Sequence, residues 1–178
     1  MNFGVVYGQT AFGLAQQLGI PRGKAGSYIR AYFEKVPGVD RYMKELIDVA
    51  KVRGFSETIF GRRRRIPELT MRAGASRSYG ERIARNTPIQ GSAADILKIA
   101  MIAVERALAE SPARAPQGAR PWAEMLLTVH DELIFEVDED RVDDLVDLAR
   151  PLMESAATLS VPLRVDAGHG RRWADCKG

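Results

Sequence analysis

The chain has few of the features that mark secreted, membrane or metal-thiolate proteins. Its single cysteine, Cys176, excludes an intramolecular disulfide and a zinc site built from several cysteines. Cys176 also stands in a terminal tail, which argues against a catalytic thiol. No apolar run approaches the length of a membrane span, and the N-terminus lacks the basic and apolar regions of a secretory signal peptide. The sequence therefore predicts a protein of the reducing cytoplasm with no membrane partner.

Two enzyme classes are disfavoured because their motifs are missing. Gly168 and Gly170 do not form a dinucleotide-binding loop, since no strand–Gly-x-Gly-x-x-Gly–helix context surrounds them. The pair His130-Asp131 could suggest a hydrolase dyad, but no Gly-x-Ser-x-Gly sequence accompanies it. Repeats, heptads and low-complexity tracts are also absent, and a hydrophobic content of 46% is typical of a globular protein. The length suits one ordinary domain with a real core.

Charge is distributed unevenly, although the net charge is only +3. Residues 51–85 carry ten Arg or Lys and three Glu, a net charge of +7. Residues 124–154 carry eleven acidic residues against Arg141 and Arg150, a net charge of −9. A dense basic segment suits a polyanion such as nucleic acid, because arginine binds phosphate bidentately. The alternative is a solvated basic face with no nucleic-acid partner.

The spacing of apolar and turn residues predicts an α+β fold, with helices and a small antiparallel sheet. Helices are expected over residues 2–18 (broken near Gly8), 21–35, 39–53, 75–86, 92–110 and 138–158 (kinked at Pro151). Strands are expected at residues 55–60 and 159–167, a turn at Pro37-Gly38, a loop at residues 111–121, and an interruption at Pro88 and Gly91. Gly61 and the arginines after it predict a hairpin with a basic turn. Trp173 is expected to be a packing residue.

Residues 126–137, Leu-Leu-Thr-Val-His-Asp-Glu-Leu-Ile-Phe-Glu-Val, contain the most informative pattern. Two apolar runs flank His130, Asp131 and Glu132, which predicts a tight antiparallel hairpin over residues 124–137 with these side chains at its tip. A turn tip normally carries Gly, Asn or Asp-Gly. Potential metal ligands there indicate a site on a rigid scaffold. The alternative is a solvated turn whose charges have no role.

Four segments of the chain form a further pattern: Asn2-Phe3-Gly4-Val5-Val6-Tyr7-Gly8, the run from Arg82 to Asp95, Val129-His130-Asp131-Glu132, and the terminal Gly168-x-Gly170-x-x-Trp173. They occur in the order found in the family A DNA polymerases, and together the chain resembles that family over almost its whole length. The resemblance implies a C-terminal part of the polymerase domain. Residues 1–54 would be a helical fingers portion, and residues 55–178 a palm portion with a small antiparallel sheet, packed helices and the catalytic hairpin.

The activity that this resemblance implies is template-directed nucleotidyl transfer to a primer 3′-end in DNA replication and repair. Primer–template DNA and deoxynucleoside triphosphates would be the partners, and a nucleoid-associated place in the cytoplasm is expected. The family's Lys and Arg of the fingers helix, and its other catalytic Asp, would precede Met1. The isolated chain is therefore expected to be inactive. The alternatives are a non-catalytic duplex-binding module, or one half of a split polymerase that the missing N-terminal portion completes.

The resemblance also implies roles for the residues of the hairpin tip. Asp131 would be a catalytic ligand of Mg²⁺, and Glu132 a weaker or indirect one, in a two-metal site that this chain leaves incomplete. Mg²⁺ takes a few carboxylates together with phosphate oxygens and water, so carboxylates at a hairpin tip suit it. His130 would lie beside the primer terminus.

Two further groups of residues are expected to contact nucleotide or DNA. Phe3 and Tyr7 are four residues apart and share one helix face. The family places them at the nascent base pair, with Gly8 close to the template; the alternative is a core aromatic stripe. The expected DNA-binding residues are Arg82, Asn86, Gln90, Arg62, Arg63 and Arg64. The first three recur every four residues and would test pair shape in the minor groove; the alternative is a helix cap at Asn86 among exposed polar residues.

Overall fold

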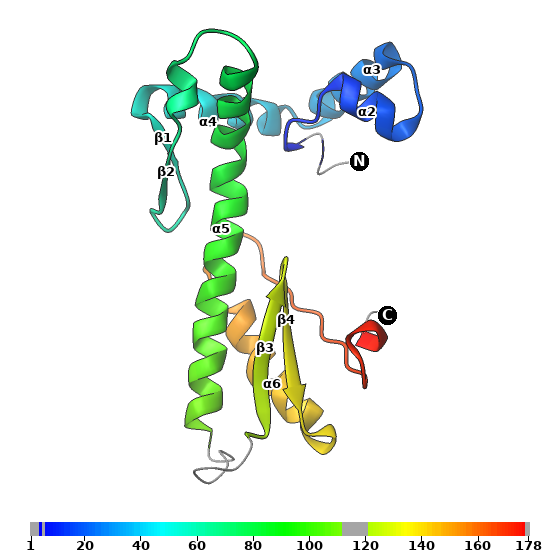
Figure 1. Ribbon diagram of the computed structural model, residues 1–178, viewed down its shortest axis with the longest axis vertical. Coiled ribbons are helices and arrows are strands. Elements are labelled where there is room, and N and C mark those ends of the chain that lie inside the picture. The colour runs from blue at the N-terminus through cyan, green and yellow to red at the C-terminus, as the bar shows by residue number, and fades with distance from the viewer. Residues whose placement is uncertain (1–3, 5, 112–120, 177–178) are drawn as a thin grey trace. The chain divides into compact units, whose positions relative to one another are not determined.

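A computed structural model describes residues 4, 6–111 and 121–176 (Figure 1). These residues form helices and two separate two-stranded antiparallel sheets, which confirms the predicted α+β class. The chain divides into two compact units, residues 1–92 and residues 93–178. The boundary falls inside the longest helix. The predicted division after residue 54 separated a fingers portion from a palm portion, which is a different criterion from the compactness of the units. It stays a prediction.

Three helices open the first unit: α2 (Ala11–Leu18), α3 (Arg22–Lys35) and α4 (Pro37–Arg53). The predicted break near Gly8 is confirmed, because Gly8 has a φ of 87° and forms a turn before α2. Thr10 caps α2 by accepting a hydrogen bond from the Gly13 N–H at 3.1 Å. The predicted turn at Pro37-Gly38 is wrong. Pro37 is the first residue of α4, where its fixed φ suits a helix and its missing N–H needs no partner.

A short hairpin follows α4, which ends at Gly54 in the left-handed conformation. Strands β1 (Phe55–Glu57) and β2 (Arg63–Arg65) pair antiparallel, and the Thr58 N–H closes the turn on the Arg62 carbonyl at 2.9 Å. The predicted hairpin is confirmed, but most of the arginine run lies in the strand rather than in the turn. After the 3-10 helix η1 (Pro67–Thr70), a small core forms from residues of α4, this segment and α5: Ala50, Ile66, Leu69, Ile83 and Ala84.

The longest helix, α5, runs without a break from Ala75 to Glu110 (Figure 1). The predicted interruption at Pro88 and Gly91 is wrong, for a reason that lies outside the helix. Pro88 has no N–H, so the Ala84 carbonyl lacks its helical donor. The buried Ser56 hydroxyl of β1 donates to that carbonyl instead, at 3.1 Å. A distant strand thus supplies the hydrogen bond that proline removes.

Further contacts hold the same hairpin against the end of this proline-containing turn. The Ser92 hydroxyl donates to the Pro88 carbonyl and accepts the Ile59 N–H at 3.0 Å. A Cβ on Gly91 would lie 2.7 Å from the Cγ2 of Thr58. Gly91 is therefore required for close approach of the hairpin, and it does not end the helix.

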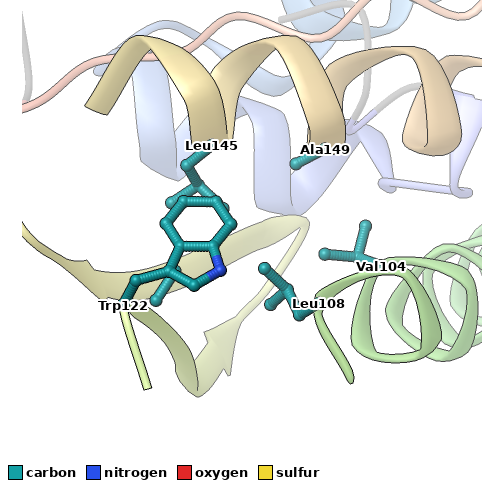
Figure 2. Close-up of a cluster of buried hydrophobic side chains, with 6 residues drawn as sticks. Val104, Leu108, Trp122, Leu145 and Ala149 are labelled. Carbon is teal, nitrogen blue, oxygen red and sulfur yellow. The ribbon is translucent and has the colours of Figure 1, made fainter. Parts of the chain in front are cut away.

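The second unit holds the longer hairpin and a covering helix. Strands β3 (Ala123–Val129) and β4 (Glu132–Val137) pair antiparallel, which confirms the predicted hairpin. The 3-10 helix η2 (Glu139–Arg141) leads into α6 (Val142–Glu154), and η3 (Trp173–Cys176) stands near the end. Figure 2 shows the core between these elements, where Leu145 and Ala149 of α6 face Trp122 and Leu108.

Several expectations for the last third of the chain are corrected. α6 ends at Glu154 rather than at residue 158, and it passes through Pro151. Residues 159–167 form no strand; the Val165 N–H donates to the Glu154 carboxylate at 3.0 Å. Trp173 is 47% exposed, so about half of its surface is buried. Most of the predicted loop at 111–121 lies outside the described residues. In the described part of the chain, no helix is long and apolar enough to cross a membrane.

We predict that Ser56→Ala lowers the free energy of unfolding by about 1–3 kcal/mol, because it leaves the buried Ala84 carbonyl without a donor. The control is Ser27→Ala, where an exposed hydroxyl donates to the Lys24 carbonyl within a regular helix. That change should stay within about 0.5 kcal/mol of the unaltered chain. Denaturant titration followed by circular dichroism measures both. Equal stabilities for the two variants would contradict the proposed replacement hydrogen bond.

Candidate nucleic-acid interface

A pocket of about 510 Å³ lies in the unit of residues 1–92 and gathers many of the predicted site residues. It is lined by Gly4, Tyr7, Gly8, Gln9, Gln17, Arg64, Tyr79, Arg82, Ile83, Asn86 and Gln90. Among these lining residues Arg64 and Arg82 carry charge, and none is acidic. The pocket is thus positive and hydrogen-bonding, which suits a phosphate-bearing ligand.

One side of the pocket is a stripe along α5. Tyr79, Arg82, Asn86 and Gln90 are three or four residues apart, so they project from one face of a continuous helix. Asn86 lies inside this helix, which makes the helix-cap reading of that residue wrong. The stripe exists because the helix continues through Pro88. A helix broken there would turn Gln90 away from Arg82.

The Arg62–Arg65 run is divided by the geometry of strand β2. Arg64 pairs with Ser56, whose hydroxyl reaches the Ala84 carbonyl of α5, so Arg64 shares the face of the hairpin that meets this helix and lines the pocket. Arg63 points to the opposite face, where its Nε donates to the Glu57 carboxylate at 2.6 Å. The Arg63 guanidinium also lies 4.9 Å from the centroid of the Phe55 ring.

Arg62 has a structural contact as well. Its Nη2 donates to the Gly91 carbonyl at 3.0 Å, which ties the hairpin turn to α5. Of the three arginines predicted from this run to bind DNA, the structure therefore brings Arg64 into the pocket. Arg62 and Arg63 are bonded to other parts of the protein and do not line it.

The N-terminal segment forms another side of the pocket. Tyr7 and Gly8, two of the residues expected to contact nucleotide or template, both line it, whereas Phe3 lies outside the described residues. Gln9 and Gln17 also line the pocket and are joined by a hydrogen bond of 2.7 Å. Sequence reasoning missed both glutamines, and no spacing signal singles them out.

Tyr79 is a further residue that the sequence analysis missed. The Arg82 guanidinium lies 5.6 Å from the centroid of the Tyr79 ring, and both residues line the pocket. An aromatic residue three positions before an arginine in a predicted helix is a detectable signal for such a pair. Stacking on the ring limits the orientations of the Arg82 side chain.

The second unit presents the hairpin tip. His130 and Asp131 form the two-residue turn between β3 and β4, and Glu132 begins β4. All three residues are exposed. His130 has a φ of 56°, the one positive value among the described non-glycine residues. Strained backbone of this kind is concentrated at functional sites.

The tip is supported from below by the core of the unit. Met125, Phe135 and Val137 of the hairpin pack against the buried cluster drawn in Figure 2, which joins residues of α5 and α6 to Trp122. The register shifts between Met125 and Leu127, so Leu126 is a bulge. Beyond the bulge, Leu127 and Val129 face the side opposite to Met125. Bulges re-aim strands in this way near active sites. The sequence analysis did not detect it.

The two carboxylates at the tip can serve as part of a metal site. Among the described residues, no group of three His, Cys, Asp or Glu side chains is placed to hold an ion. Asp131 and Glu132 are adjacent, exposed oxygen ligands, and Mg²⁺ accepts one or two protein carboxylates when phosphate and water supply the rest. The donor set therefore fits Mg²⁺ as a partial site.

The profile of DNA polymerase family A matches residues 1–175. The chain belongs to this family. It is 46% identical over 177 residues to DNA polymerase I of Lactococcus lactis subsp. cremoris, covering 99% of this chain and 19% of that protein. It is 49% identical over 173 residues to DNA polymerase I of Pseudomonas aeruginosa, covering 97% of this chain and 18% of that protein.

A solved structure is also similar: the polymerase domain of Pol1 from M. smegmatis in complex with DNA primer-template and dNTP. The TM-score is 0.88 with 43% identity, and the match covers all of this chain and 30% of that one. The predicted resemblance to family A is confirmed. The chain spans about a fifth of the length of the relatives that it matches. Members of the family generally use divalent metal ions.

We predict that His130→Val is less stable than His130→Asn by about 1–2 kcal/mol, because a β-branched residue resists a positive φ and asparagine tolerates it. Denaturant titration of the two variants measures the difference. Exposed Glu124 in the same hairpin provides the control pair. There valine should be at least as stable as asparagine, since valine favours strands. The same order at both positions would contradict strain at the tip.

Proposed function

We propose that this chain forms part of a DNA-directed DNA polymerase, the enzyme that transfers nucleotides from deoxynucleoside triphosphates to a primer 3′-end on a template. The main observation behind this proposal is the first pocket, which has no acidic residue in its lining. Its lining includes Tyr7, Arg64, Arg82, Asn86 and Gln90. Two observations support it further: the carboxylates at the hairpin tip, and the similarity to a polymerase domain bound to primer-template and dNTP.

The chemistry of the pocket suits template and duplex DNA. Tyr7 offers a flat face on which any base can stack, and Gly8 lets the backbone approach the template closely. Arg82 and Gln90 are hydrogen-bond donors, and the minor groove presents acceptors that all base pairs share. These residues, with Asn86, would therefore test the shape of a pair without reading its sequence. Arg64 would neutralise backbone phosphate. Phe3 would lie by the incoming nucleotide.

The chemistry of the tip suits the transfer step. The primer 3′-hydroxyl loses its proton to water and its oxygen attacks the α-phosphorus, the bond from this phosphorus to the bridging oxygen of the β-phosphate breaks, and pyrophosphate leaves. Asp131, with weaker support from Glu132, would hold Mg²⁺. Two such ions, when bound, would activate the attacking oxygen and neutralise the leaving group. His130, fixed by the tight turn, would lie beside the primer terminus.

Residues 1–54 would then belong to the fingers and residues 55–178 to the palm of the polymerase domain. The chain spans about a fifth of its relatives, so residues outside it would complete the catalytic site. A non-catalytic duplex-binding module is the competing function. It shares the pocket but makes no use of the hairpin tip, so binding and extension must be tested separately.

We predict that the chain binds duplex primer–template without sequence preference. If roughly three to five phosphates are neutralised, the slope of log K against log salt is about −3 to −4.5. Arg64→Ala should reduce the magnitude of this slope by about 0.9, the contribution of one phosphate. Fluorescence anisotropy across a salt series measures the slope.

The matched control for this experiment is Arg63→Ala. Arg63 follows Arg62 in the same run but pairs with Glu57 on the opposite face of the hairpin. Its removal should leave the slope unchanged. Equal effects of Arg63→Ala and Arg64→Ala would contradict the pocket as the DNA contact and favour a diffuse basic face. If the affinity did not depend on salt concentration, the proposal that this chain binds nucleic acid would be wrong.

We predict that a chimera extends a primer when this chain replaces the matching segment of the M. smegmatis polymerase domain. Asp131→Asn in the chimera should lower the extension rate by about 10²-fold or more, because a charge aimed at the transition state is lost. Asp138→Asn, at an exposed acid just after β4, is the control and should retain activity. Primer extension with Mg²⁺ and four triphosphates is the measurement.

The outcomes separate the two functions. A folded chimera that binds DNA but does not extend a primer would contradict the polymerase function and support the binding module. The 178-residue chain alone should bind DNA without extending it. Rapid extension by the chain alone would contradict the proposal that residues outside it complete the site.

A further inference from the structure

Arg85 is a charged residue that the proposed function does not use. It stands on α5 one turn after Arg82, but it lines a second pocket of about 240 Å³ rather than the first. That second pocket also contains apolar side chains of α3 and α4, among them Ile29, Phe33 and Met43. The stem of an arginine can pack along such apolar surface while its guanidinium reaches farther.

The Arg85 guanidinium lies against the backbone of Gly8. A Cβ placed on Gly8 would be 3.1 Å from Nη2, 3.2 Å from Cζ and 3.4 Å from Nη1 of Arg85. Because these three atoms are almost equally distant, the flat face of the guanidinium covers the position where a side chain would stand. A planar group suits this contact, and the round ammonium of lysine does not.

The hydrogen bonding of Arg85 leaves its guanidinium available for the contact with Gly8. Its Nε is buried and has no hydrogen-bond partner among the described residues. Asp40, the acidic residue of the second pocket, forms an ion pair with Lys44 at 2.5 Å. Among the described residues, no ion pair joins Arg85 to Asp40.

Gly8 is a weakly restrained point of the N-terminal segment, so a contact that holds its backbone would fix the turn. Its φ of 87° lies in a region that glycine enters freely, and glycine has more conformational freedom than any other residue. The hydrogen bond from the Gln9 N–H to the Gly4 carbonyl, at 2.8 Å, closes the turn from one side. Arg85 closes it from the other. Tyr7, the residue before this glycine, lines the first pocket.

We propose that Arg85 is a positioning residue: its guanidinium holds the Gly8 turn and thereby places Tyr7 at the first pocket for stacking on a base. This role rests on the proposed function. It differs from the role of Arg64, because Arg85 acts through Gly8 and Tyr7 and neutralises no phosphate. A tyrosine that is already in place when DNA arrives loses less conformational freedom on binding, and the affinity for DNA is higher as a result.

The first test measures DNA affinity and its salt dependence. Tyr7→Ala should weaken primer–template binding by about 5- to 150-fold, the range for loss of one stacking contact. Arg85→Met should weaken it by at least about threefold, and within the Tyr7→Ala effect, with no change in the slope of log K against log salt. In the Tyr7→Ala background, Arg85→Met should have no further effect. Arg85→Lys should resemble Arg85→Met, since it keeps the charge and loses the plane.

Each contrary result has a definite meaning. A salt slope reduced by about 0.9, with rescue by lysine, would make Arg85 a phosphate ligand and overturn the positioning role. Further weakening in the Tyr7→Ala background would mean a general structural role, which also overturns it. Arg106→Met on the exposed surface of α5 is the control and should change neither quantity.

The second test does not depend on DNA. A double-mutant cycle combines Gly8→Ala with Arg85→Met and follows unfolding by denaturant. The effect of Arg85→Met on the unfolding constant should be at least about twofold smaller when Gly8→Ala is present, because the new Cβ has already displaced the guanidinium. Independent effects would overturn the contact itself. If the unaltered chain binds no DNA, the proposed function and the placement of Tyr7 for it both fail, while this cycle still decides the contact.

Discussion

The hydrogen bond from Ser56 to the Ala84 carbonyl is the interaction on which the first unit depends. Proline at position 88 removes one rung of the helix, and a buried carbonyl without a donor is costly. The β1–β2 hairpin supplies the donor, and Ser92 and Gly91 hold the hairpin close to the same turn. As a result α5 remains one helix, and its polar stripe keeps a constant direction.

The same hairpin connects the small core to the charge of the pocket. Ile83 and Ala84 are buried in the core, while Arg82 on the same turn of α5 lines the pocket. Strand alternation in β2 sends Arg64 toward the pocket and Arg63 toward Glu57. A run of like charges thus acquires separate roles, since a strand directs successive side chains to opposite faces.

In the second unit, rigidity comes from the apolar cluster under the hairpin. Trp122, Leu108 and α6 support the strands, and the Arg141 guanidinium covers the Trp122 ring at 3.9 Å. The bulge at Leu126 changes which side chains face this support. The result is a tip whose strained His130 and adjacent carboxylates are held by packed strands rather than by a loose loop. Such support is what a site on a hairpin tip requires.

The sequence by itself determined the family, the α+β class, helix α4 with its glycine stop, and the hairpin with His130, Asp131 and Glu132 at its tip. These follow from local patterns and from motifs in order.

Tertiary structure decided the rest. The continuity of α5 depends on a donor twenty-eight residues away in β1. The choice of Arg64 over Arg62 and Arg63 depends on strand pairing. Residues 159–167 alternate like a strand, yet they have no ladder partner in the described part of the chain, and a strand needs one. Contacts between residues far apart in the sequence decided each of these features, and no local pattern contains them.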